Sequence, residues 1–202
     1  MRTTLLIALA LLFARTAQAQ STAPTHADLI ARAQAQGAKT YALADAVVTA
    51  AETYATADFP VDLLLGLVDV ESDFDPTSTS RLTGATWDPT AHRWVGGTRT
   101  AGIWRSTKRP PGSVGNYCCG VAQATGSTWK QCLALRDPDL AMQTAVASLG
   151  AWLKRGKTVQ RALQGYGCGN AGMKGSCKAY AKKVFGRSRV FAQPVTVKPP
   201  SV

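Results

Sequence analysis

Glu71 is the side chain whose position in the sequence best suits acid catalysis. It directly follows six Leu and Val residues between positions 63 and 70, which would cover every face of a helix. A helix that is apolar all round is a buried helix. Burial and the negative end of the helix dipole both disfavour a carboxylate anion, so they raise its pKa. The pattern therefore predicts a carboxylic acid that stays protonated near neutral pH and serves as a general acid.

The other acids near Glu71 or of its type have less suitable settings. Glu52, the second of only two glutamates, lies in an Ala-rich stretch that predicts an amphipathic helix and a solvated carboxylate. Asp75 precedes Pro76, a pattern typical of a turn former. For a lone glutamate, the alternative to catalysis is an ordinary helix-end side chain bonded to an arginine or a backbone amide.

Four short blocks of sequence follow one another around this glutamate. They are Glu71-Ser72 with Phe74 and Pro76 behind the apolar helix, Gly120–Ala124 before a helix start at 127–129, Asp137-Pro138 before a long helix, and Tyr166–Gly169 followed by Tyr180. Together, over about residues 45–186, they resemble the soluble lytic transglycosylase family, lysozyme-like enzymes that cut peptidoglycan. Ala122 stands where that family has Met, and Gly167 where it has Asn.

The resemblance implies a specific reaction. Breaking a glycosidic bond normally takes two carboxyl groups. In this family a single glutamate, here Glu71, protonates the oxygen between MurNAc and GlcNAc, then takes a proton from the C6 hydroxyl of MurNAc, which leaves a 1,6-anhydro end. Two alternatives stay open: a goose-type lysozyme-like muramidase that uses water, and a non-catalytic peptidoglycan-binding module.

Four further residues are candidates for substrate binding, each with a structural alternative. Ser72 can bond Glu71 or the sugar, or act as a helix-end hydroxyl. Gln123 can bind the N-acetyl or C6 region of the sugar, or stabilise its loop. Tyr166 can orient the Glu71 carboxyl or pack in the core, and Tyr180 can line the groove or pack in the core.

Apolar spacing predicts a mainly α, lysozyme-like single domain over residues 38–188. Expected helices begin near His26, span 40–57, follow Pro60 with Asp58 as a cap, and cover 129–135, 138–153, 158–163 and 178–185. An insertion at about 77–119 is expected to be irregular or β, with a hairpin around Gly96-Gly97. Its tryptophans, with Arg93, Arg99 and Arg105, form either a sugar-binding rim or a solvated loop. An extended tail is expected over 189–202.

The N-terminus and the cysteines indicate export. Residues 1–19 have the charged start, apolar run and Ala17-Gln18-Ala19 cleavage site of a signal peptide, and 20–37 form a lead-in to the domain. In an oxidising compartment, periplasmic or extracellular, the five cysteines predict disulfides. Cys168 can pair with Cys177, and Cys132 with Cys118 or Cys119, which leaves one thiol over.

The charge of the 202-residue chain is strongly positive. Its formal net charge of +11 suits an anionic polymer partner. Scattered positives and export argue against a nucleic-acid binder, so peptidoglycan glycan strands are the expected partner. The sequence predicts a monomer without metal or cofactor and without a membrane span after cleavage. A cell-envelope secretion, conjugation or pilus machine is a further candidate partner.

Overall fold

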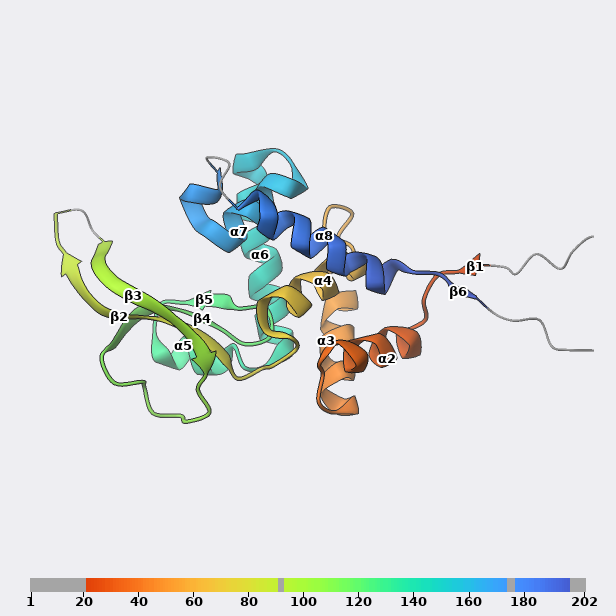
Figure 1. The fold of residues 1–202 in the computed structure, drawn as a ribbon, viewed down its shortest axis with the longest axis horizontal. Helices are drawn as coiled ribbons and strands as arrows, with labels where there is room; N and C mark the ends of the chain where they lie inside the picture. The colour runs from red at the N-terminus through yellow and green to blue at the C-terminus, as the bar shows by residue number, and fades with distance from the viewer. Residues whose placement is uncertain (1–20, 91–92, 174–176, 197–202) are drawn as a thin grey trace, which may run out of the picture.

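The computed structural model describes residues 21–90, 93–173 and 177–196, so the expected signal peptide at 1–19 lies outside the described residues. The chain forms a helical body with an antiparallel sheet on one side, and a long two-stranded arm of that sheet projects from the body (Figure 1). In the ranges described, no helix combines the length and the apolar character needed to cross a membrane.

Helix α4 (Val61–Ser72) lies in the centre of the helical body, as its composition predicts. Every residue from Leu63 to Asp69 is buried, so the helix contacts protein on all sides. The expected cap is wrong: Pro60 is the N-cap, and no side chain bonds the first amides. The helix does not need a side-chain cap because tertiary burial stabilises it.

Five other helices surround or support α4, and their starts agree well with the sequence. They are α2 (His26–Gln36), α3 (Tyr41–Tyr54), α6 (Pro138–Gly156), α7 (Val159–Met173) and α8 (Lys178–Ala192). Asp137 caps α6 through the amide of Leu140. Helix α2 contributes buried residues, including Ile30, to the same core as α4, so the expected lead-in is part of the domain.

Helix α8 runs seven residues beyond its expected end at Phe185, and the expected tail at 189–202 is therefore helical as far as Ala192. Packing explains the extension. Phe191 is fully buried, and its ring centroid lies 6.0 Å from that of Phe74. Gly66 lets the two helices approach closely, since a Cβ there would lie 2.5 Å from the backbone nitrogen of Ser188.

The insertion forms most of an ordered four-stranded sheet. Strands β2 (Ser78–Asp88), β3 (Arg93–Ile103), β4 (Ser113–Cys119) and β5 (Ala124–Gly126) are antiparallel, in the order β3-β2-β4-β5. The hairpin expected at Gly96-Gly97 is wrong, because Gly96 pairs with Ala85 inside β3 and the chain turns between Asp88 and Arg93. The arm is largely exposed, so its sequence lacks the apolar alternation that marks a half-buried strand.

Two disulfides hold the sheet and the C-terminal helices, as the cysteine spacing predicts. Cys119 bonds Cys132 and ties β4 to α5 (Trp129–Ala134), while Cys168 bonds Cys177 and ties α7 to the start of α8. Cys118 is the free thiol. A short pair, β1 (Ser21–Thr22) with β6 (Val195–Thr196), joins the two ends of the described chain.

Candidate active site

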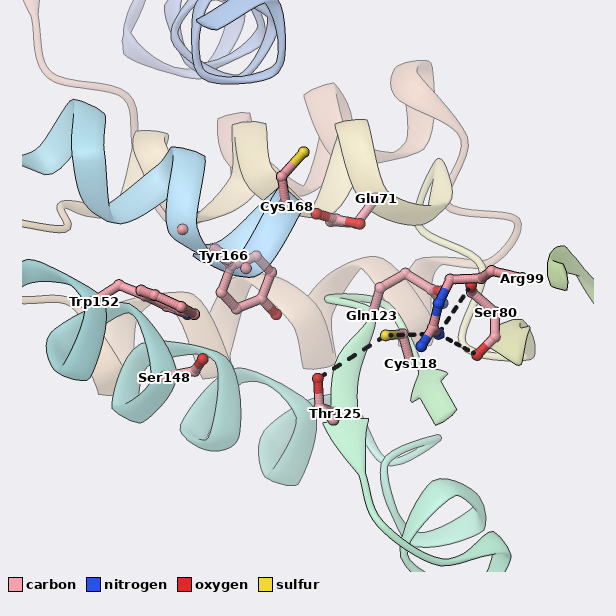
Figure 2. Close-up of a pocket in the computed structure, with 13 residues that line it drawn as sticks. Glu71, Ser80, Arg99, Cys118, Gln123, Thr125, Ser148, Trp152, Tyr166 and Cys168 are labelled. Atoms are coloured by element: carbon pink, nitrogen blue, oxygen red, sulfur yellow. Dashed lines mark hydrogen bonds between the residues drawn. The ribbon is translucent and has the colours of Figure 1, made fainter. Parts of the chain in front are cut away.

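Glu71 lies in the last turn of α4, at the edge of a cavity of about 510 Å³ between the helical body and the sheet (Figure 2). Helices α6 and α7 form one wall of the cavity, and strands β2 to β5 form the other. The side chains around Glu71 are Ser80, Arg99, Cys118, Gln123, Thr125, Ser148, Trp152, Tyr166 and Cys168.

A second cavity, of about 420 Å³, also contains Glu71 in its lining. Ser78 lines this second cavity and Ser80 the first. Residues two apart on a strand point to the same face, so both serines lie on one face of β2. The two cavities therefore lie along the same sheet face and meet at Glu71. We call them together the Glu71 groove.

The surroundings of Glu71 raise its pKa from an ordinary 4.5 to about 7. Burial is the main cause, because it removes water from the anion. A hydrogen bond from Tyr180 and the charge of Lys183 oppose the rise by favouring the carboxylate. The carboxyl group can therefore both give and accept a proton near neutral pH.

The hydroxyl that orients Glu71 is that of Tyr180, not that of Tyr166 as expected. Tyr180 Oη donates a hydrogen bond to Oε1 of Glu71, whereas Tyr166 Oη donates to the carbonyl oxygen of Ala122 at 2.6 Å. Gly167 provides the space for this arrangement, since a Cβ there would lie 2.8 Å from two ring carbons of Tyr180. The glycine at position 167 is thus directly linked to the position of Tyr180.

Ser72 and Gln123 line the groove, but their polar atoms also hold backbone together. Ser72 Oγ donates to the carbonyl oxygen of Val121 at 2.6 Å, and Gln123 Nε2 donates to that of Ser78 at 2.8 Å. The structural alternatives for both residues are therefore realised. The first bond fixes the 120–123 turn against the end of α4, and the second fixes it against the start of β2.

Sequence reasoning missed Trp152, which lines the groove from α6. Its helical spacing predicted a core position, yet the residue is only half-buried and the Arg155 guanidinium lies 4.5 Å from its ring centroid. An indole face of this kind can stack on a sugar ring. Ser148, one turn earlier on α6, also lines the groove, and no pattern in the sequence marks it.

The expected rim of the insertion is present only in part. Arg99 lines the groove, and its Nη1 lies 3.4 Å from the carbonyl oxygen of Ser80 and 3.5 Å from Cys118 Sγ. Trp104 instead belongs to its own loop, where Nε1 donates to the carbonyl oxygen of Lys108. Arg105 is exposed, and the side chain of Arg93 lies outside the described residues.

Asp73 and Asp75 line the second cavity with Glu71. Asp75 acts as the expected turn former, because its Oδ1 accepts bonds from the amide and hydroxyl of Thr77 at 2.8 and 2.7 Å. Within the described ranges, no cluster of three or more His, Cys, Asp or Glu side chains is arranged to hold a metal ion.

Comparison with known proteins found no match to this chain among protein-family models, curated proteins or solved structures.

Proposed function

We propose that this protein is an exported, lysozyme-like peptidoglycan lytic transglycosylase that forms 1,6-anhydro-MurNAc ends. The observation that carries the proposal is the position of Glu71, a carboxyl group with a pKa of about 7 at the junction of two cavities. A binding module has no need of such a poorly solvated acid. The four sequence blocks that resemble the lytic transglycosylases add support.

The reaction uses Glu71 first as an acid and then as a base. Its proton passes to the glycosidic oxygen as the bond from that oxygen to C1 of MurNAc breaks. The C6 hydroxyl oxygen then bonds to C1, and its proton returns to the carboxylate. Between these steps the hydrogen bond from Tyr180 stabilises the anion.

The shape and lining of the Glu71 groove suit a sugar polymer. Cavities on both sides of Glu71 allow a chain to pass the acid and be cut internally. Trp152 offers an aromatic face for stacking, and Arg99 offers a guanidinium for the carboxylates of the wall polymer. The polar side of the groove is supported by hydrogen bonds to backbone carbonyl oxygens from Ser72, Gln123 and Tyr166.

A muramidase is the second candidate, and one observation favours it. Asp73 and Asp75 share the second cavity with Glu71, and a hydrolase needs a second carboxylate. The bonds from Thr77 to Asp75 reduce that carboxylate's value as a base. Asp73 keeps the muramidase open, but the four sequence blocks resemble the lytic transglycosylases, so the transglycosylase is the better supported of the two reactions.

Digestion of purified peptidoglycan tests the proposal. The products of the wild type and Glu71→Gln are identified by mass, with Glu52→Gln as the matched control, since Glu52 lies on α3 and contacts His26. Anhydro ends from the wild type and Glu52→Gln, but not from Glu71→Gln, support the transglycosylase. Reducing ends would instead establish the muramidase, and absence of products from all three would leave only a binding module.

A further inference from the structure

The outer face of α8 carries cations that the proposed reaction does not use. Lys178, Lys182 and Arg189 line a cavity of about 640 Å³ together with Phe185 and with Gln160 of α7. All three cationic residues are exposed. We call Lys178, Lys182 and Arg189 the α8 cationic row.

The row lies on the opposite side of α8 from the groove. Lys178 is two residues before Tyr180, and Lys182 is two residues after it. At about 100° per residue, each lies about 200° around the helix from Tyr180, on nearly the opposite side. Tyr180 points toward Glu71, so the row points away from it. Figure 1 shows α8 along the outside of the helical body, next to α7 and above α4. A ligand on the row therefore leaves the groove open.

The charge around the row is strongly one-sided. Residues 140–202 contain 11 Lys or Arg and not one Asp or Glu. Neither α7 nor α8 can therefore offer the row an acidic side chain. Arg187 lies on another face of α8 and is not part of the row. Its Nε lies 3.5 Å from the carboxylate of buried Asp69. The row keeps a positive potential available to a ligand.

The spacing of the row favours an extended ligand. Lys178 and Lys182 are one turn apart, and Arg189 lies about 16 Å along the helix from Lys178 at 1.5 Å per residue. A single phosphate cannot reach all three. A bilayer is disfavoured too, because the exposed large hydrophobic residues of the described chain, Tyr41, Trp87, Ile103 and Leu140, all lie outside α8.

We propose that the α8 cationic row binds a linear polyanion, a flexible chain that carries a phosphate or carboxylate group on each repeat. Binding there retains the protein on an acidic polymer while the groove remains free. This site does not depend on the reaction proposed for Glu71.

Fluorescence anisotropy with labelled long-chain polyphosphate and poly-L-glutamate tests the proposal, and the two probes distinguish phosphate from carboxylate as the bound group. The full chain without its signal peptide is compared with Lys178→Gln/Lys182→Gln/Arg189→Gln. An exposed ion pair increases the affinity by up to about fivefold. Loss of three such pairs is therefore expected to weaken the binding of at least one probe roughly a hundredfold at low salt.

The matched control is Lys108→Gln/Arg109→Gln/Lys130→Gln, which removes the same charge from exposed positions on the sheet side. It is expected to change affinity only a few fold. Equal losses in the two triple variants would show a general charge effect and overturn the proposal. Binding to vesicles of phosphatidylglycerol and phosphatidylcholine is measured in parallel. If the α8 triple variant loses binding to the vesicles but binds both probes as before, the proposal is overturned in favour of a membrane surface.

Footprinting of the wild type keeps the test valid if the triple variant does not fold. Acetylation of lysines is measured with and without the bound probe. Protection of Lys178 and Lys182, with Lys108 and Lys130 still modified, is the expected result. Protection of all four lysines to the same degree would contradict a discrete site.

Discussion

The hydroxyl of Tyr180 on α8 donates a hydrogen bond to Oε1 of Glu71 at the end of α4. This bond joins two helices that are more than a hundred residues apart in the sequence. It favours the carboxylate, while burial favours the neutral acid. Together with the charge of Lys183, which also favours the carboxylate, these effects set the pKa of Glu71 at about 7.

Tyr180→Phe removes the donor that stabilises the carboxylate, so the pKa of Glu71 is expected to rise. Because the proposed reaction starts from protonated Glu71, the alkaline limb of the pH–rate profile should move to higher pH. A bond to a charged group contributes about 1.5–3 kcal/mol, so kcat should fall by at least about tenfold. An unchanged alkaline limb would show that Tyr180 has only a packing role.

Gly167→Ala is expected to displace the Tyr180 ring, because the added Cβ would lie 2.8 Å from its Cδ1 and Cε1 atoms. The alkaline limb should shift in the same direction as in Tyr180→Phe. Gly150→Ala is the matched control, since a Cβ at that position meets nothing within 4 Å. In a double-mutant cycle, the shift of the alkaline limb caused by Gly167→Ala should be smaller when Tyr180 is already replaced by Phe. Full additivity would contradict the proposed contact.

Glu71→Gln is expected to make folding less sensitive to pH. The folded pKa of about 7 exceeds the ordinary value of 4.5, so the unfolded chain loses the proton first as pH rises. The wild-type free energy of unfolding should therefore fall by about 3 kcal/mol over this window relative to the variant, at 1.36 kcal/mol per pKa unit. Urea unfolding of both proteins below pH 4.5 and above pH 7 measures this difference. A constant difference across the window would contradict the raised pKa.

His26 is expected to add a pH dependence of the same sign at the junction of α2 and α3. Its Nε2 lies 2.9 Å from Asp45 Oδ1 and its Nδ1 lies 2.8 Å from Glu52 Oε2. The bonds to these carboxylates raise the pKa of His26 above 6.5. Its stabilisation is therefore complete below pH 6.5 and is lost as pH rises through the folded pKa. Comparison of His26→Gln with the wild type by thermal unfolding across that range measures the effect, and a gain in wild-type advantage with rising pH would contradict it.

The buried helix and the position of Glu71 at its end could be predicted because both depend on local sequence. A continuous apolar face and a terminal acid leave few alternatives for packing. Disulfides could also be predicted, including the Cys168–Cys177 pair, although Cys118 and Cys119 could not be told apart as the partner of Cys132. Their side chains point to opposite faces of β4, and the register of that strand depends on its distant partners.

The partner of Glu71 could not be predicted in the same way. Tyr180 lies within the expected helix 178–185, whereas Tyr166 lies beyond the expected end of the helix at 158–163, which in fact continues to Met173. The choice between the two hydroxyls depends on where α8 crosses α4. That crossing depends on the close contact of Gly66 with Ser188 and on the space above Gly167. Such contacts join distant segments and leave no periodic pattern. Trp152 was missed for a related reason, since an aromatic on an amphipathic helix is more often part of the core.

The most direct measurement is an NMR titration of the full chain labelled with ¹³C at the glutamate carboxyl groups. The chain has only two glutamates, Glu52 and Glu71, so two signals are expected, and Glu71→Gln assigns them. We predict that the Glu71 signal titrates with a pKa of about 7. A Glu71 signal that titrates near 4.5, the ordinary value for glutamate, would contradict the account.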